Sequence, residues 1–359
     1  MKRYIYILLA VLISTSLIMG GCASTASPTA NTSTSSVQQG AVNVDSKQVY
    51  ELKFTDQYTA QMTTGIMDHM LADSISEKTN GRVKFTFYHS ESLGKSVDFL
   101  NMVKGGVVDA ANCSVSLYPS HLEMELGPEI PGLGIPDRKS RLDITWDLFE
   151  KGYYTGLTSY KVLGFIATPE STIFLKKKAT SVDYLKGLKL RTTSAPMSEL
   201  IKRLGGTPVT MAGSESYMNL DRGIIDGTIT MYEAFEQMKL YEVAKYAIKN
   251  PLAYGSMIVI MNKEKWNSLP PDIQAQVDEG IQEYRAELIA MTEEADANWP
   301  DQLRQLGMDV YSLSAEEEAR LQEIASTIKN DWVAEREAKG LKGKAMMDEI
   351  ETFLTNYKK

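Results

Sequence analysis

From Val49 onward, hydrophobic and polar positions alternate along the chain with two different periods. Residues 82–88, RVKFTFY, have a period of two, which is typical of a strand with one buried face. Met62, Ile66 and Ile75 have the spacing of one helix face, and the TNG that follows is a typical helix end. Because segments of the two kinds follow one another along most of the chain, the pattern predicts an α/β fold.

The same two periods predict the remaining strands and helices. The sequence shows no internal repeat, and no linker divides this part of the chain. The two halves of the chain are therefore expected to exchange strands rather than to form consecutive domains. Ser314 and Glu317 form a capping box at the start of the last predicted helix, and Pro300 is expected to end the helix before it. Strands are predicted at 50–56, 161–168, 172–178, 187–191, 207–211, 224–230 and 254–262, and helices at 196–204, 214–222, 270–299 and 313–338.

The first part of the chain has a different pattern. Two basic residues precede an apolar run over residues 4–19, which is the anatomy of a secretory signal peptide. The following LIMGGCAS resembles a bacterial lipobox, so residues 1–21 are expected to be removed and Cys22 to become a lipidated N-terminus. A plain signal peptide with an incidental cysteine is the alternative. Residues 22–47, rich in Ser, Thr and Ala, are expected to form a flexible, lipid-anchored tether.

Composition narrows the class of function. The chain has 359 residues, enough for two domains, and a formal net charge of −8, which argues against nucleic acid because phosphates need a basic surface. The three histidines are far apart, and the sequence has no phosphate-binding loop, dinucleotide fingerprint or nucleophile elbow. These features favour a binding protein over an enzyme, with no metal ion and no cofactor. Cys113 is interpreted as a small buried apolar residue.

One charged residue stands at an unusual place. In GLKLRTTSAPMSEL, residues 187–200, Leu188 and Leu190 are the inward positions of a strand, and Arg191 follows where a helix is about to begin near Pro196. A guanidinium group can bind a carboxylate through two parallel hydrogen bonds, and a helix start adds free N–H groups and a positive field. Arg191 is therefore predicted to bind an anionic ligand. An ion pair within the protein, or plain solvation, is the alternative.

Four segments around Arg191 carry a resemblance: LKGLKLRTTSAP, LGGTPVTM, SESYMNLDRGIIDG and KLYEVAKY. In this order, behind a signal peptide, they resemble the DctP-type extracytoplasmic solute-binding proteins of tripartite ATP-independent periplasmic (TRAP) transporters, and the resemblance extends from Tyr50 to Tyr311. It implies a periplasmic-binding-protein-like fold with two α/β lobes, hinge strands between them, a long helix across both and a ligand in the cleft. The lobes are expected at 48–167 plus 256–298 and at 168–255 plus 299–359.

The resemblance also implies a ligand and partners. Arg191 takes the place of the family's carboxylate-binding arginine, so the expected ligand is a small organic acid. The integral membrane subunits of a TRAP transporter would receive it, and transport driven by an ion gradient needs no nucleotide site. A sensory module that presents a bound ligand to a membrane receptor would share the same cleft and is the alternative. An anchored hydrolase is a third hypothesis.

Departures from the family pattern bear on the ligand. Ser171 stands near the place of a second arginine, Gly213 near that of an aromatic residue, and Thr230 near that of an asparagine. One arginine instead of two predicts a ligand with one carboxylate. Further candidates, for which ordinary packing is the alternative, are residues able to hydrogen-bond a ligand's hydroxyl or amine groups or placed at strand ends: Tyr217, Tyr232, Glu233, Gln57, Tyr58, Tyr88, Asn112 and Ser114.

Overall fold

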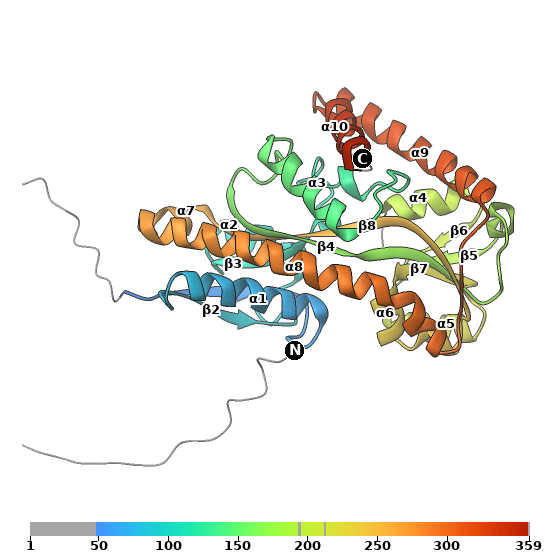
Figure 1. Cartoon of the computed structure of the whole chain (residues 1–359), viewed down its shortest axis with the longest axis horizontal. Helices are drawn as coiled ribbons and strands as arrows, with labels where there is room; N and C mark the ends of the chain where they lie inside the picture. Colours follow the sequence, from blue (N-terminus) through green and yellow to red (C-terminus); the bar gives the residue numbers. More distant parts are fainter. Residues whose placement is uncertain (1–47, 193–194, 212, 358–359) are drawn as a thin grey trace, which may run out of the picture. The chain divides into compact units, whose positions relative to one another are not determined.

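The computed structural model describes residues 48–192, 195–211 and 213–357. Its strands form one nine-stranded sheet with the order β2-β1-β3-β8-β4-β7-β5-β6, and β9 pairs with β8 (Figure 1). Parallel pairs at each end of the sheet are joined through helices, so the predicted α/β class is confirmed. One end holds β1 (Tyr50–Thr55), β2 (Val83–Tyr88) and β3 (Ala110–Ser114), and the other holds β5 (Lys189–Arg191), β6 (Thr207–Val209) and β7 (Gly227–Met231).

Two long antiparallel strands belong to both ends of the sheet. They are β4 (Tyr160–Leu175) and β8 (Tyr246–Asn262), which run side by side through its middle (Figure 1). The C-terminal part of β8 pairs with β3, and its N-terminal part pairs with β9 (Asp309–Tyr311). The C-terminal part of β4 pairs with β7. The two halves therefore share strands, as the sequence predicted.

The prediction of separate strands at 161–168 and 172–178 is wrong, because residues 161–168 and 172–175 belong to one strand, β4, which ends at Leu175. The register between β4 and β8 shifts between Ala167 and Glu170. A bulge of this kind interrupts the alternation of side chains while the strand continues. The period-of-two signal is lost at that point, which explains why one strand was divided into two.

The long helix α8 (Pro271–Gln305) contacts α1 (Thr63–Lys78) at one end of the sheet and β9 at the other. It crosses both halves in Figure 1, as expected. The helix was predicted to end at Pro300, but it continues through this residue. A proline inside a helix removes one main-chain hydrogen bond. Burial of Trp299 at 2% exposure and Leu303 at 0% supplies packing that holds the last turns in place.

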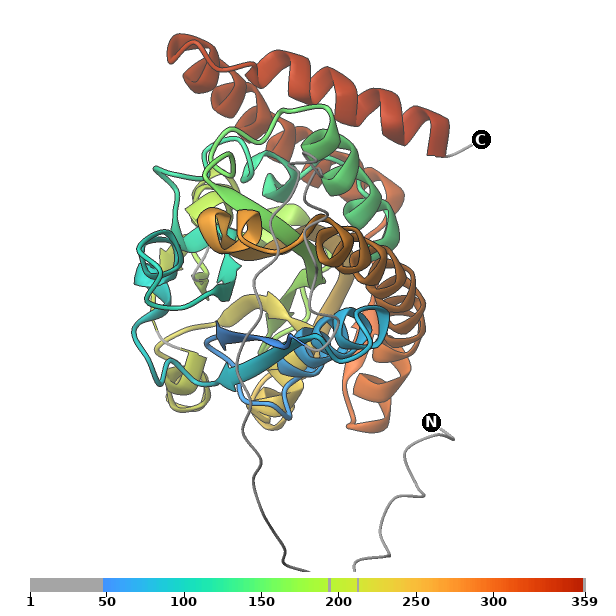
Figure 2. The same cartoon turned by 90° about the vertical axis from the view of Figure 1, so that its left-hand side faces the viewer.

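The other helices pack around the sheet. Helix α10 (Gly343–Tyr357) contacts α3 (Arg138–Glu150), and α9 (Ala315–Ala338) contacts α4 (Ala195–Arg203), so the C-terminal pair touches both halves. Figure 2 shows this red pair beside the green α3. Within the described residues, no helix is both long and apolar enough to cross a membrane. The helices are α2 (Phe99–Lys104), α3 (Arg138–Glu150), α4 (Ala195–Arg203), α5 (Ser216–Asp221), α6 (Tyr232–Gln237), α7 (Lys263–Asn267), α9 (Ala315–Ala338) and α10 (Gly343–Tyr357).

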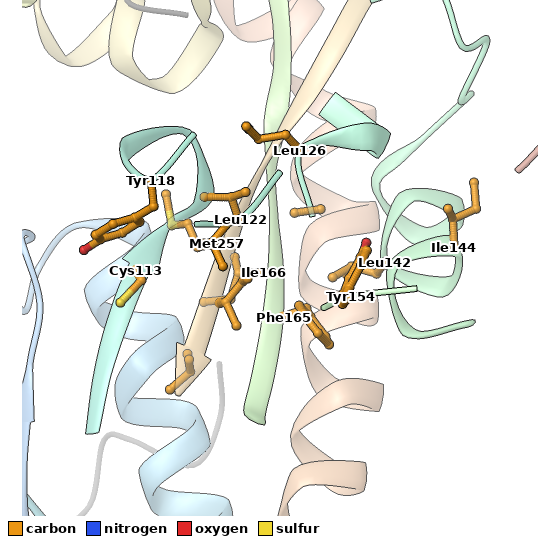
Figure 3. Close-up of a cluster of buried hydrophobic side chains, with 14 of the residues drawn as sticks. Cys113, Tyr118, Leu122, Leu126, Leu142, Ile144, Tyr154, Phe165, Ile166 and Met257 are labelled. Atoms are coloured by element: carbon orange, nitrogen blue, oxygen red, sulfur yellow. The ribbon is translucent and has the colours of Figure 1, made fainter. Parts of the chain in front are cut away.

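The core follows the alternation of β4. Figure 3 shows Phe165 beside Leu142 and Tyr154, whereas Ile166, the next residue, points toward the side of Cys113. Successive side chains of a strand point to opposite faces, so β4 builds hydrophobic packing on both sides of the sheet. The side chain of Cys113 is 1% exposed, which confirms the prediction of a small buried residue.

Candidate functional site

A cavity of about 180 Å³ lies in the middle of the sheet, where β4 and β8 pass the ends of β3, β5 and β7. Its wall is polar, because eight of the fifteen lining residues carry a hydroxyl group. Pockets that bind small molecules combine apolar surface with a few polar groups that orient the ligand. The lining residues are Tyr58, Ser114, Ser116, Glu129, Thr168, Ser171, Thr192, Met197, Ile229, Thr230, Met231, Ala253, Gly255, Ser256 and Met257.

Four residues predicted from the sequence meet at this cavity: Tyr58, Ser114, Ser171 and Thr230. They come from both ends of the sheet, because Tyr58 and Ser114 follow or end strands of one half while Thr230 lies on β7 of the other. Gln57 is one step removed, since its Nε2 donates a hydrogen bond of 2.6 Å to the hydroxyl oxygen of Tyr58. Burial raises the pKa of Tyr58, which keeps this hydroxyl neutral.

Arg191 ends β5 beside the cavity and is 6% exposed. Its Nε and Nη2 donate hydrogen bonds of 3.2 and 3.1 Å to the main-chain carbonyl of Met211. Burial lowers the pKa of the Arg191 guanidinium, and an arginine remains charged in proteins. Thr192, the next residue, and Met197 of α4 both line the cavity, so the backbone of Arg191 adjoins its wall, although Arg191 is not itself among the lining residues. No salt bridge joins Arg191 to a carboxylate among the residues that the structure describes.

Gly213 lies against this arginine. A Cβ atom at this position would come within 3.6 Å of Arg191 Nη2 and 3.1 Å of Met238 Sδ. The absence of a side chain therefore leaves room beside the guanidinium, at the place where the family resemblance led us to expect an aromatic ring.

The neighbouring candidates Tyr232 and Glu233 have different surroundings. Glu233 lines an adjoining cavity of about 60 Å³, which shares four lining residues with the larger one: Tyr58, Thr168, Met231 and Met257. Burial raises the pKa of Glu233. Tyr232 lies behind, where its hydroxyl accepts a hydrogen bond of 3.1 Å from Arg138 Nη2 and its ring stacks on Trp299. Tyr232 lines neither cavity.

Three more candidates contact protein groups instead of the cavity. Asn112 is buried and donates from Nδ2 to Asp68 Oδ1 at 2.7 Å. The Tyr217 hydroxyl donates to Glu242 Oε2 at 2.7 Å. Tyr88 ends β2, and its main-chain oxygen accepts a hydrogen bond from the Thr55 hydroxyl. A ligand contact for these three residues stays a prediction.

Glu129 and Ser256 belong to the cavity wall and were missed from the sequence. Glu129 ends the short 3₁₀ turn Gly127–Glu129, and its Oε1 accepts a hydrogen bond of 2.8 Å from the Ser256 main-chain nitrogen. The signal available was a single charged residue in the otherwise apolar loop LGPEIPGLGIP. A loop gives no period from which the direction of a side chain could be predicted.

The chemistry of the cavity is that of binding. One carboxyl group and a set of hydroxyl groups in its wall, with a buried arginine next to the lining residue Thr192, can orient a small polar anion. Among the residues described, no group of three or more His, Cys, Asp or Glu side chains is placed to hold a metal ion.

A two-lobed α/β protein with a polar cavity between the halves of a shared sheet is a ligand-binding protein of the periplasmic type. This chain belongs to the family described as bacterial extracellular solute-binding protein, family 7, whose DctP model matches residues 54–335. The family predicted from the sequence is therefore confirmed. The family comprises solute-binding proteins rather than enzymes.

Relatives and solved structures agree with this assignment. The chain is 26% identical over 257 residues to the 2,3-diketo-L-gulonate-binding periplasmic protein YiaO of Escherichia coli, covering 67% of this chain and 74% of YiaO. A TRAP periplasmic solute-binding protein from Desulfovibrio salexigens superposes with a TM-score of 0.80 at 23% identity, covering 86% of this chain and 96% of that one. A TRAP solute-binding protein from Rhodoferax ferrireducens, in complex with benzoate, gives a TM-score of 0.76 at 21% identity and covers 86% and 99%. The expected two-lobed fold is confirmed.

Proposed function

We propose that this protein captures a small organic acid in the cavity between its lobes and delivers it to the membrane subunits of a TRAP transporter. The observation that carries the proposal is Arg191, a buried arginine next to Thr192, which lines a cavity rich in hydroxyl groups. Its orientation by the Met211 carbonyl prepares it for a carboxylate. The names of relatives support an acid as ligand, since they include a C4-dicarboxylate-binding protein of Rhodobacter capsulatus and a sialic acid-binding protein of Vibrio cholerae.

The ligand has one carboxylate under this proposal. No lysine or arginine is among the residues that line the cavity, and Arg191 is the arginine next to the lining residue Thr192. A second carboxylate would enter a buried site without a cation, which costs several kcal/mol. The site is therefore suited to a monocarboxylate.

Binding is coupled to closure of the lobes. The strands β4 and β8 pass through both halves and supply the hinge, which supports lobe boundaries at 48–167 plus 256–298 and 168–255 plus 299–359. Residues of both halves line the cavity, so a ligand that contacts both of them stabilises the closed state. The ligand leaves chemically unchanged, because the protein acts by binding.

The protein is held at the outer face of the cell membrane under this proposal. The signal peptide, the lipidated Cys22 and the tether 22–47 are proposed from the sequence alone and lie outside the described residues. Mass spectrometry of the mature N-terminus tests this part: a diacylglyceryl group on Cys22 is expected, and a mature chain that begins elsewhere would contradict it.

A thermal-shift screen with mono- and dicarboxylates, followed by calorimetry, tests the ligand class. A ligand that binds the folded protein raises its melting temperature by mass action. Arg191→Ala is expected to weaken binding of the best acid by about 2–5 kcal/mol, and Arg191→Lys to weaken it as well because the planar fork is lost. Arg222→Ala, an exposed arginine of the same half, is the control and should bind normally. If no acid shifts the melting temperature, or if Arg191→Ala binds like the wild type, the proposal is wrong.

A further inference from the structure

The Glu129 carboxyl group is the acidic group in the wall of the main cavity and is 7% exposed. Its position is fixed by β8, because the Ser256 main-chain nitrogen donates to Glu129 Oε1 at 2.8 Å. Ser256 lines the cavity too, so the Glu129 carboxyl group and the residue that holds it in place belong to the same wall.

A buried arginine lies behind this wall. Arg141 of α3 is 0% exposed and donates hydrogen bonds to the hydroxyl groups of Ser256 and Thr145. Burial raises the pKa of Glu129 to about 7, and attraction by Arg141 opposes this rise. Ser256 links the two groups, because its main-chain nitrogen donates to Glu129 and its hydroxyl oxygen accepts from Arg141.

We propose that Glu129 is a specificity-determining residue and that the cavity takes a hydroxylated monocarboxylic acid, whose hydroxyl group donates a hydrogen bond to the Glu129 carboxyl while Arg191 binds its carboxylate. This inference rests on the proposed function and adds a second contact between the protein and the ligand. The eight hydroxyl-bearing residues of the lining provide donors and acceptors for such a ligand, whereas Tyr58 is the one aromatic ring among them. A polar aliphatic acid therefore fits this wall better than an aromatic acid.

The volume limits the size of the ligand. An engineered cavity of about 150 Å³ in another protein holds benzene, which has six non-hydrogen atoms. The cavity of about 180 Å³ therefore fits an acid of roughly six to eight non-hydrogen atoms.

The charges already present in the protein favour a hydroxyl group over an ammonium group on the ligand. Arg141 and Glu129 both hydrogen-bond to Ser256, and the charge of Arg141 opposes the rise in the pKa of Glu129. An ammonium group would add a third positive charge to a site that holds Arg141 and Arg191, whereas a neutral hydroxyl group needs an acceptor alone. A buried site built to accept a hydroxyl hydrogen bond discriminates strongly against an analogue that lacks it, because the acceptor is left unpaired.

Calorimetry with matched acids tests the inference. The pairs are lactate and propionate, 3-hydroxybutyrate and butyrate, and 4-hydroxybutyrate and butyrate, with 3-aminobutyrate as the ammonium probe. In the wild type, at least one hydroxy acid is expected to bind about tenfold or more tightly than its deoxy partner, and 3-aminobutyrate more weakly than 3-hydroxybutyrate. Glu129→Gln should reduce this ratio at least threefold.

Two further variants keep the test decisive. Because Glu129→Gln removes a carboxyl group that interacts electrostatically with the buried Arg141, the double variant Glu129→Leu with Arg141→Met removes both charges and should bring the ratio close to one. Glu125→Gln is the matched control: Glu125 is another buried glutamate of the same loop, does not line the cavity, and should keep the wild-type ratio.

Each outcome has a distinct meaning. Equal binding of hydroxy and deoxy acids by the wild type, tighter binding of the amino acid, or an unchanged ratio in both Glu129 variants would overturn the role of Glu129 and leave the proposed function intact. Absence of binding by every acid would sink the proposed function itself.

Discussion

The main-chain carbonyl of Met211 accepts hydrogen bonds from both Nε and Nη2 of Arg191, at 3.2 and 3.1 Å. Two bonds to one oxygen fix the plane of the guanidinium group as well as its position. β5 supplies the backbone of Arg191, and the segment after β6 supplies the acceptor, so two neighbouring parallel strands hold the group together. A preoriented arginine loses less conformational freedom when a ligand binds, which favours affinity.

Filling the space at Gly213 is expected to disturb this arginine. In Gly213→Ala, the new Cβ contacts the flexible Met238 side chain at 3.1 Å, and a small loss of affinity is expected. In Gly213→Leu, the larger side chain should displace the guanidinium and weaken acid binding by about 1–3 kcal/mol. Calorimetry measures both variants, and a melting temperature without ligand reports folding. Wild-type affinity in a folded Gly213→Leu variant would show that the space is not used.

Glu125 gives a prediction on pH. Burial raises its pKa from 4.5 to about 7, so between these values the folded state binds more protons than the unfolded state. The free energy of unfolding therefore falls as the pH rises through this window, by roughly 3 kcal/mol from this group. Glu125→Gln should match the wild type near pH 5 and exceed its stability near pH 8. Urea unfolding at several pH values measures the difference, and parallel curves for the two proteins would contradict the shift.

Gly280 lets α8 approach α1. A Cβ atom at Gly280 would lie 2.8 Å from the Ile75 Cα atom, and Ser74 Oγ donates to the Gly280 carbonyl at 2.8 Å. Alanine is the better helix former by about 1 kcal/mol, but the two backbones must separate to accept it. Gly280→Ala is therefore expected to lower the free energy of unfolding by about 1–3 kcal/mol.

The control for this change is Glu279→Ala, an exposed position of the same helix, where the wild-type stability should remain. Denaturant unfolding compares the two variants. A gain of stability in Gly280→Ala would mean that helix propensity outweighs the contact.

The pair of Arg138 and Asp296 connects α3 with α8, at 2.6 Å. Arg138 is 1% exposed, so Asp296→Ala leaves a buried charge without its partner and should cost about 3–5 kcal/mol of stability. The double variant with Arg138→Met should recover part of that loss. Asp301→Ala removes the exposed partner of Arg304 on the same helix and should change stability by less than about 1 kcal/mol. Equal effects of Asp296→Ala and Asp301→Ala in urea unfolding would refute the role of the buried pair.

The candidate site was predictable where a residue ends a strand. Tyr58 and Ser114 reach the cavity because strand ends of the two halves meet at one place, whereas Ser171, inside β4, and Thr230, on β7, were indicated by their places in the family pattern. Asn112 shows the limit of this reasoning: it lies on the same strand as Ser114, two residues earlier, yet it turns to Asp68 in the core. Whether such a residue meets a ligand or another protein group depends on the elements packed against it.

The sequence by itself determined the α/β class, the family and the place of Arg191, because local periodicity and motif order are properties of neighbouring residues. Tertiary structure decided the rest. Hydrogen bonds to partner strands kept β4 continuous across its bulge, and packing of Trp299 and Leu303 carried α8 past Pro300. Glu129 reached the cavity through its bond to Ser256, 127 residues away in the chain. Contacts between distant segments leave no periodic pattern in the sequence, so they can be identified only in the folded structure.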